Sequence, residues 1–186
     1  MAGVTLRRIK PGALLHRIHR PEHDALYFGP EGPAPTFRFD APDGSYKVLY
    51  AARSLETAFG ETLVRSPHVP YVTSTAVEAR VRSELAVTRS LKLYPLIDAG
   101  VSARGLSFTD LHGDAYARTQ EVSAWVHGNT SADGILYTSR FDNQHCVALF
   151  DRAIDAVVTT PASKLAISPA EATALSEHFG KAYVEP

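Results

Sequence analysis

The sequence predicts a mixed α+β domain of short strands with flanking helices, and three observations lead to this prediction. Runs rich in aromatic and β-branched residues recur along the 186-residue chain, as in Tyr46–Ala52, and are typical of strands. Helical patterns separate some of these runs but not others, so the regular alternation of a doubly wound sheet is missing. The length and the 45% apolar fraction suit one domain over residues 1–186, without a linker or a repeat.

The first half of the chain contains most of the predicted strands. A strand over Leu14–His19 precedes a Pro- and Gly-rich loop over Pro21–Gly44, and a loop of this length in a compact domain usually serves function. After the strand at Tyr46–Ala52, Ser54 is expected to cap a helix that runs to about Arg65. Further strands are predicted at 71–76, 84–88 and 91–94, the last two as a hairpin.

The second half is predicted to begin with a helix. Asp114–His127 has a helical pattern, with Trp125 expected on the buried side. A polar segment follows between two apolar runs. These two runs are predicted strands, at 134–137 and 146–150.

A terminal helix has the clearest start signal in the sequence. Ser168 is placed as the N-cap, Pro169 as the first helical residue, and Glu171 completes a capping box. The helix is predicted to run from Ser168 to about Lys181.

Composition excludes several classes of protein. The formal net charge is −1, and the basic residues are spread along the chain, so no direct nucleic-acid partner is expected. No window approaches the roughly 20 apolar residues of a membrane helix, and Met1–Lys10 lacks the apolar run of a signal peptide. The single cysteine, Cys146, excludes a disulfide framework and suits the reducing cytoplasm, where we expect the chain to act.

Common nucleotide and catalytic motifs are missing from the sequence. Neither G-x-G-x-x-G nor G-x-x-x-x-G-K-[ST] occurs, so side chains would have to hold any nucleotide. His16, His19 and His23 have no carboxylate at ligand spacing, and no metal site is expected. Ser107 and Ser139 lack the G-x-S-x-G surroundings of a hydrolase nucleophile, which leaves a serine hydrolase as a weak alternative.

A set of residues distributed along the chain gives a stronger indication of function than these motifs do. It combines an arginine on the first strand, an aromatic loop, an Arg-Phe-Asp segment, a tyrosine before a helix that carries a glutamate, and a late Tyr-x-Ser-Arg. In order and spacing this set resembles the RES-domain family, which is named for its Arg, Glu and Ser. The matching segments run from about residue 14 to about residue 150 and are His16–Ile18, Tyr27–Gly29, Phe37–Asp40 with Gly44, Val48–Glu61 and Asp133–Arg140.

The resemblance implies both a fold and an activity. Members of the family are toxins paired with Xre-like antitoxins, and their fold is similar to that of diphtheria-toxin-type ADP-ribosyltransferases. The implied substrate is NAD⁺, cleaved between nicotinamide and ribose, with no metal. The acceptor of ADP-ribose stays open between water, phosphate and a target protein. The implied partners are NAD⁺, a cognate Xre-like antitoxin and, if transfer occurs, that target protein.

Glu61 is the carboxylate that the resemblance places in catalysis. Cleavage leaves positive charge on the ribose, as in glycoside hydrolysis, and a nearby carboxylate stabilises that charge. Glu61 lies off the apolar stripe of its predicted helix. Without the resemblance it would be interpreted as a solvated helix residue.

Two arginines and two tyrosines are the implied nucleotide-binding residues. A planar guanidinium holds phosphate oxygens by paired hydrogen bonds, which suits Arg17 and Arg38 to the pyrophosphate. Arg17 is also assigned to the catalytic set by resemblance, and surface ion pairs are the alternative for both arginines. Tyr27 and Tyr50 are expected to stack on the cationic nicotinamide ring. For Tyr50, at the end of a strand, a place in the core is an equal alternative.

Ser139 completes the implied catalytic set. By resemblance its hydroxyl orients the ribose or the amide, with Arg140 or Asn143 assisting. Serines directly after strands are most often turn residues, so this role depends on the resemblance. The main alternative to an enzyme is a non-catalytic nucleotide-binding or partner-binding module of the same fold. The residues whose joint presence argues against that alternative are Arg17, Tyr50, Glu61 and Ser139.

Overall fold

A nine-stranded twisted sheet runs through the molecule, which a computed structural model describes over residues 4–64, 66 and 68–185. The strand order is β1-β6-β7-β8-β3-β2-β5-β10, and β9 pairs with β5 outside this path. A small second sheet pairs β4 with β11 in parallel. The strands are β1 (Arg7–Ile9), β2 (Leu14–His19), β3 (Val48–Ala52), β4 (Tyr71–Thr73), β5 (Val81–Val87), β6 (Leu91–Leu96), β7 (Gly134–Thr138), β8 (His145–Phe150), β9 (Val157–Thr159), β10 (Leu165–Ala166) and β11 (Ala182–Val184).

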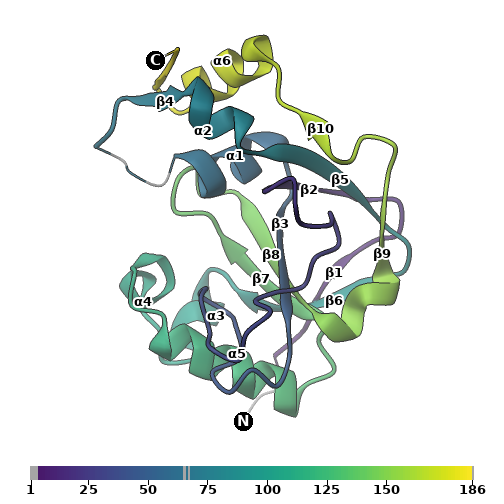
Figure 1. Cartoon of the computed structure of the whole chain (residues 1–186). Coiled ribbons are helices and arrows are strands. Elements are labelled where there is room, and N and C mark those ends of the chain that lie inside the picture. The colour runs from purple at the N-terminus through teal and green to yellow at the C-terminus, as the bar shows by residue number, and fades with distance from the viewer. Residues whose placement is uncertain (1–3, 65, 67, 186) are drawn as a thin grey trace.

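The helices form two groups at opposite ends of the molecule (Figure 1). One group lies with β4 near the C-terminus, and the other lies near the N-terminus. No described helix has both the length and the apolar character needed to cross a membrane. The first group contains α1 (Leu55–Leu63), α2 (Ser74–Glu78) and α6 (Pro169–His178), the second contains α3 (Ala99–Ser102), α4 (Phe108–His112) and α5 (Ala117–Asn129), and the 3₁₀ helix η1 (Asp151–Ala156) joins β8 to β9.

Both faces of the central strands are buried. Along β8, Cys146, Ala148 and Phe150 pack into one apolar cluster, and the alternating Val147 and Leu149 pack into another on the opposite face. This is the alternation that a strand imposes on its side chains. Apolar residues at successive positions of β3 and β8 therefore mark strands covered on both sides, and the predicted mixed α+β fold is confirmed.

Helix α1 begins as the sequence predicts and ends earlier. The Oγ atom of Ser54 accepts a hydrogen bond from the N–H of Thr57 at 3.2 Å, which satisfies a free donor in the first turn. The helix ends at Leu63, and Arg65, its predicted end, lies outside the described residues. Gly60 lets α1 approach α6 closely, because a Cβ there would lie 2.7 Å from the ring of Phe179.

Other predicted boundaries shift by several residues. The strand predicted over 71–76 ends at Thr73, whose side chain caps α2. The helix predicted over 114–127 begins at Ala117. The capping box at Ser168 is confirmed, but its helix ends at His178, because Gly180 at φ +65° turns the chain before Lys181.

The predicted hairpin at 84–88 and 91–94 is wrong. β5 pairs with β2 along one edge and with β9 and β10 along the other, so it has no edge left for β6. β6 instead lies between β1 and β7 on the other side of the sheet. The short connection from β5 to β6 therefore leads from one part of the sheet to another. Two strands that are close in sequence need not be neighbours in the sheet.

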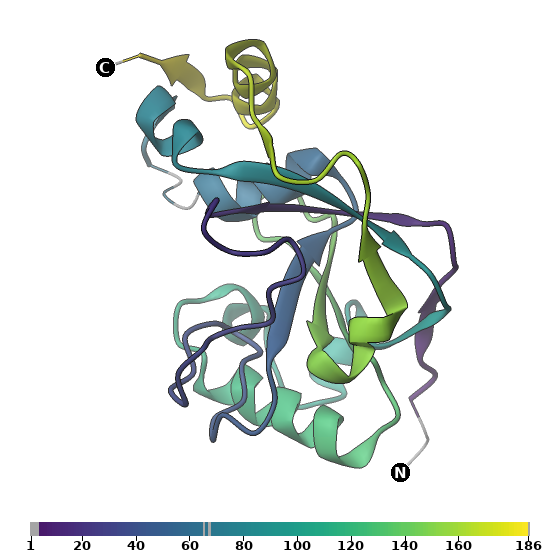
Figure 2. The same cartoon turned by 45° about the vertical axis from the view of Figure 1, so that its right-hand side comes forward.

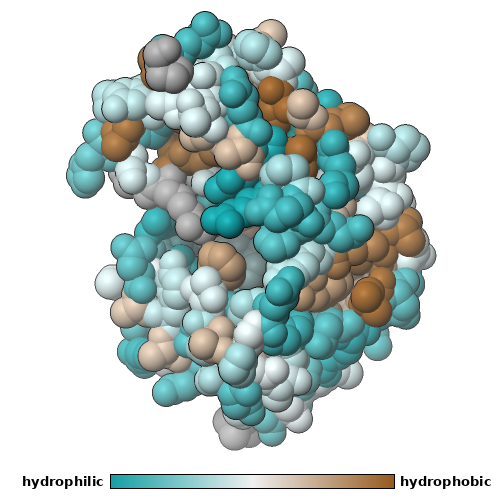
Figure 3. Space-filling view, in the orientation of Figure 1, coloured by the Kyte–Doolittle hydropathy of each residue, from teal (hydrophilic) through white to brown (hydrophobic). Residues whose placement is uncertain are grey.

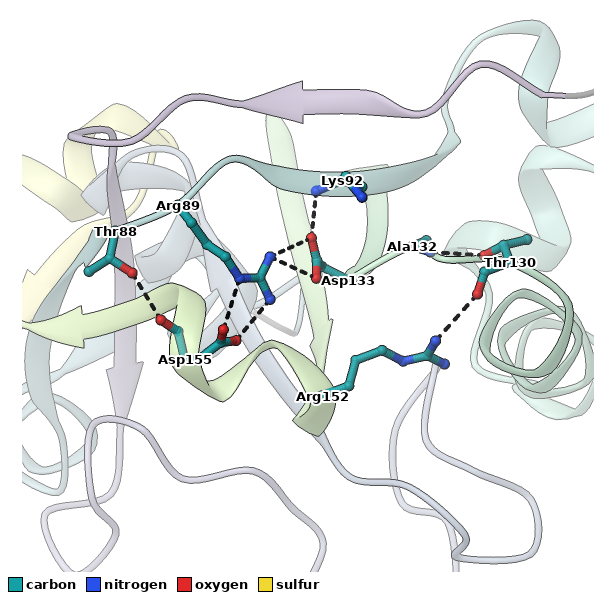
Figure 4. Close-up of polar contacts among 8 residues, drawn as sticks. All are labelled: Thr88, Arg89, Lys92, Thr130, Ala132, Asp133, Arg152 and Asp155. Carbon is teal, nitrogen blue, oxygen red and sulfur yellow. Dashed lines mark hydrogen bonds and ion pairs between the residues drawn. The ribbon is translucent and has the colours of Figure 1, made fainter.

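Arg89 fixes that connection by binding two acidic residues from distant segments (Figure 4). Its Nε and Nη2 atoms donate to the two carboxylate oxygens of Asp155 in η1, at 3.0 and 2.8 Å. Its Nη1 atom donates to the buried Asp133 at 3.0 Å, and Asp133 also accepts the N–H of Lys92 at 2.8 Å. These contacts direct the chain away from β5 and hold the residue that precedes β7.

Trp125 lies on the exposed side of α5, contrary to the prediction. The buried face of α5 contains Thr119, Ser123 and Val126, and the two hydroxyls bind backbone carbonyls, so that polar residues are accommodated there. The indole is 37% exposed, and the Cζ atom of Arg104 lies 3.5 Å from its ring centroid. A cation–π contact of this kind explains how a large aromatic residue is retained outside the core.

Two glycine-to-alanine substitutions should have opposite effects on stability. A Cβ at Gly134 would collide with the carbonyl oxygen of Ala148 and lie 2.8 Å from the Cα atom of Leu149, so Gly134→Ala should lower the free energy of unfolding by about 2 kcal/mol. Gly128, on α5, has open space around it, and Gly128→Ala should raise that free energy by up to about 1 kcal/mol. Urea unfolding of both variants tests this. Equal effects would contradict the close packing at Gly134.

Candidate active site

A cavity of about 440 Å³ opens where β2 and β3 separate. The two strands pair only at His16 and Ala52, whereas β2 pairs with β5 along its whole length. Figure 3 shows a hollow on this side of the molecule between the two groups of helices, bordered by hydrophilic side chains. The lining residues are His16, Arg17, Ile18, His19, Arg20, His23, Tyr27, Phe37, Arg38, Tyr50, Ala51, Ala52, Ala58, Glu61, Thr62, Arg80, Tyr116, Tyr137 and Cys146.

The cavity brings together most of the residues singled out in the sequence. Arg17 comes from β2, Tyr50 from β3 and Glu61 from α1, and the loop between β2 and β3 adds Tyr27 and Arg38. In both cartoon views this loop lies beside α5 (Figures 1 and 2). A second cavity of about 150 Å³ shares residues with the first, and its lining is Arg38, Glu61, Asp114, Tyr116, Arg140 and Phe141.

Arg17 lies in the cavity wall and binds the backbone of the loop between β2 and β3. Its Nη1 atom donates to the carbonyl oxygens of Ala25 at 2.9 Å and Tyr27 at 3.0 Å. Burial lowers its pKa to about 10, so it stays charged at neutral pH. None of the ion pairs among the described residues includes Arg17. Its charge is therefore available to an anion in the cavity.

Tyr27 presents an aromatic surface close to Arg17. Its ring stacks on His23 with centroids 4.2 Å apart and planes inclined by 11°. The ring also lies over Gly29, where a Cβ would come within 2.5 Å of it. The glycine of the Tyr-Phe-Gly segment is therefore needed for this position of the ring.

Tyr50 is bound at its hydroxyl by a buried carboxylate that the sequence-based site did not include. The hydroxyl donates to Oδ1 of Asp40 and accepts the N–H of Phe39, both at 2.9 Å. Oδ2 of Asp40 accepts the N–H groups of Thr36 and Phe37 at 2.9 and 2.7 Å. Burial, and then the charge of Asp40, raises the pKa of Tyr50 well above its ordinary value. Tyr50 thus stays protonated while it lines the cavity.

Arg38 connects the loop between β2 and β3 to the segment that precedes α5. Its Nη1 atom donates to the carbonyl oxygen of Gly113 at 3.3 Å. Its Cζ atom lies 5.1 Å from the ring centroid of Tyr116, just before α5. Tyr116 lines both cavities and was not anticipated, because nothing in the sequence links it to the other site residues.

Glu61 lies half-buried where the two cavities meet. Tyr137 and Cys146, which are cross-strand neighbours on β7 and β8, line the larger cavity with it. Burial raises the pKa of both groups, and the charge of Glu61 raises each further. Both therefore remain neutral beside a carboxylate.

Ser139 and Asn143 lie outside the lining of both cavities. The Oγ atom of Ser139, which is 1% exposed, accepts the N–H of Phe141 at 3.1 Å within the turn between β7 and β8. Asn143 occupies the same turn at φ +58° and is exposed. The turn is attached to α1, because the hydroxyl of Thr57 donates to Asp142 at 2.7 Å. The roles implied for Ser139 and Asn143 stay predictions.

A family model for the RES domain matches residues 14–173 of the chain. The chain belongs to the RES domain family. The match begins at β2 and extends beyond the predicted end near residue 150, into α6.

A solved structure supports the fold of this RES domain. A chain of the crystal structure of the M. tuberculosis MbcT–MbcA toxin–antitoxin complex has a TM-score of 0.72 and 18% identity. The similarity covers 91% of this chain and 92% of that chain. No curated protein matches the sequence significantly. The similarity in structure confirms the fold that the family resemblance implied.

The histidines and serines that suggested a metal site or a serine hydrolase have structural contacts in this RES domain. His19 Nε2 bonds the hydroxyl of Ser83 at 2.8 Å, and His23 stacks on Tyr27. Within the described residues, no group of His, Cys, Asp and Glu side chains is arranged to hold a metal ion. Ser107 caps α4 through a capping box with Asp110 and does not line the cavity.

The RES domain should lose stability as the pH falls from about 7.5 to about 5.5. Burial lowers the pKa of four histidines below 6.5, so the unfolded chain binds protons more readily than the folded one. Their contribution is complete above the unfolded pKa and is lost as the pH falls from that value through the lower folded pKa. Urea midpoints at the two pH values test this, and an unchanged midpoint would contradict it. The four residues are His16, His19, His112 and His127.

Proposed function

We propose that this RES domain is the toxin of a toxin–antitoxin system and acts in the cytoplasm by cleaving the nicotinamide–ribose bond of NAD⁺. The observation that carries the proposal is the meeting of two arginines, two tyrosines and a glutamate in one cavity. A volume of about 440 Å³ lies within the range of small-molecule sites. The five residues are Arg17, Tyr27, Arg38, Tyr50 and Glu61.

Each of these residues matches one part of NAD⁺. Arg17 and Arg38 offer guanidinium donors to the pyrophosphate, which carries two negative charges. Tyr27 and Tyr50 offer ring faces to the flat, cationic nicotinamide. Because the hydroxyl of Tyr50 already binds Asp40, its aromatic ring is the part that faces a ligand.

Glu61 supplies the charge that the reaction requires. As the bond to nicotinamide breaks, its electron pair leaves with the base and positive charge develops on the ribose, as in glycoside cleavage. A carboxylate fixed by a helix stabilises this charge without reorganising. Tyr137 and Cys146 remain neutral, so neither adds a second negative charge beside Glu61 in the wall of the larger cavity.

A toxin role fits the family and the named structural neighbour. The similar solved chain comes from a toxin–antitoxin complex, and the partner proposed for this chain is an Xre-like antitoxin. We propose that this antitoxin restrains the enzyme by covering the cavity. Arg17 and Arg38 would then face acidic or polar groups of the antitoxin when NAD⁺ is absent.

Nicotinamide release from NAD⁺ by the purified protein tests the proposal. The reaction should be run without additives, with phosphate and with cell lysate, while the fate of ADP-ribose is followed. Free ADP-ribose identifies hydrolysis, ADP-ribose-1-phosphate identifies phosphorolysis, and a labelled protein identifies transfer. Nicotinamide release in any of these conditions supports the proposal. Binding of NAD⁺ without release in all three would instead indicate a non-catalytic binding module.

A further inference from the structure

The cavity has more positive charge than NAD⁺ needs. Among the described residues, its lining contains four arginines and a single carboxylate, Glu61. The pyrophosphate of NAD⁺ carries two negative charges, and the nicotinamide ring offsets one of them. The proposed function assigns Arg17 and Arg38 to the pyrophosphate, which leaves Arg20 and Arg80 without a ligand group.

Arg20 and Arg80 flank the last pair of residues between two strands. His19 at the end of β2 pairs with Val81 at the start of β5, so Arg20 follows this pair and Arg80 precedes it. Within the described part of the chain, Arg80 takes part in no ion pair, and Arg20 pairs with Glu22 at 3.7 Å, with both side chains more than half exposed. A bound anion would therefore meet two weakly compensated positive charges here.

Glu61 belongs to the same end of the cavity. Thr62, which follows Glu61 on α1 and also lines the cavity, donates its hydroxyl to the carbonyl oxygen of Ile18 at 3.3 Å. Ile18 precedes Arg20 by two residues, so this part of α1 lies against the end of β2 that Arg20 and Arg80 flank. A nicotinamide ribose held at Glu61 therefore places the phosphate attached to it near these two arginines.

That phosphate differs between NAD⁺ and ADP, although the two molecules share the adenosine and both phosphates. In NAD⁺ it is esterified to the nicotinamide ribose and carries one negative charge. In ADP it is terminal, and a terminal phosphate carries about 1.5 to 2 negative charges at neutral pH. ADP thus places more negative charge beside Arg20 and Arg80 than NAD⁺ does, and it has no further group that reaches Glu61.

We propose that ADP binds this cavity more tightly than NAD⁺ does and inhibits the enzyme, with Arg20 and Arg80 holding its terminal phosphate. This inference rests on the proposed function, because it takes the orientation of the ligand from cleavage at Glu61. Two guanidinium groups recognise a phosphate monoester through charge-assisted hydrogen bonds. Because ADP and NAD⁺ occupy one site, the inhibition is competitive.

Calorimetric titration of the purified chain with ADP and with ADP-ribose, at low ionic strength and without divalent cations, tests the inference. ADP-ribose is the matched ligand, since it has the same two phosphates but carries a ribose ester in place of the terminal charge. ADP should bind about tenfold more tightly than ADP-ribose. Arg80→Ala should remove most of this difference.

Two further variants complete the titration. Arg20→Ala changes an exposed position and should also reduce the preference for ADP. Arg8→Ala is the matched control, since Arg8 is exposed on β1 and does not line the cavity. It removes the same net charge and should leave the preference intact.

Inhibition of nicotinamide release separates this inference from the proposed function. ADP should raise the KM for NAD⁺ and leave kcat unchanged. Equal affinities for ADP and ADP-ribose, a preference for ADP that both arginine variants retain, or inhibition that lowers kcat alone would overturn the inference and leave the proposed function standing. If no nicotinamide is released from NAD⁺, the proposed function fails, and calorimetry decides the ADP site. A preference for ADP that depends on Arg80 then supports the site, and equal affinities refute it.

Discussion

Glu61→Gln should reduce the rate of nicotinamide release by at least about a hundredfold while leaving most of the affinity for NAD⁺ intact. The amide keeps the size of the side chain and removes the charge that opposes the developing cation. The loss should therefore appear in kcat rather than in KM. Steady-state kinetics of the variant, with binding of ADP-ribose measured separately, distinguish the two parameters.

Glu56→Gln is the matched control for this variant. Glu56 lies in the first turn of α1 and does not line either cavity. Its replacement removes the same charge from the same helix and should leave kcat within about twofold of the parent. Turnover by Glu61→Gln at the rate of Glu56→Gln would refute the role of Glu61.

Local sequence patterns account for the strands and helix caps that were predicted correctly. β2 and β3 have compositions typical of strands, and the Ser54 and Ser168 caps are fixed by residues only three positions away. Such signals depend on neighbours in sequence, so they can be read without the fold. The pairing of β5 and β6 depends on which edges other strands occupy, and this information is not local.

The site shows the same division between local and distant determinants. The positions of Arg17, Tyr50 and Glu61 follow from the elements that carry them, and the family resemblance supplied their roles. Tyr116, a part of the wall that the sequence did not indicate, comes from a segment that meets the other wall residues only in three dimensions. The burial of Asp40 likewise depends on packing between the loop and β3.

The buried carboxylate of Asp40 is expected to stabilise both the fold and the cavity wall. It is 1% exposed and accepts three hydrogen bonds, from the hydroxyl of Tyr50 and the N–H groups of Thr36 and Phe37. Through these bonds it joins β3 to the loop that carries Arg38. Removing it leaves buried donors without an acceptor, which costs far more than losing a solvated carboxylate.

Asp40→Ala should therefore lower the free energy of unfolding by on the order of 3 kcal/mol and raise the KM for the dinucleotide. Urea unfolding and nicotinamide release measure the two effects, and Asp40→Asn, which keeps the shape and one acceptor, should recover part of each. Asp43→Ala is the control, since Asp43 is an exposed residue that accepts the N–H of Ser45 at the same loop's surface. A double-mutant cycle with Tyr50→Phe should show coupling, because both changes remove the same hydrogen bond. Additive effects, or equal stabilities of Asp40→Ala and Asp43→Ala, would mean that this carboxylate does not position the wall.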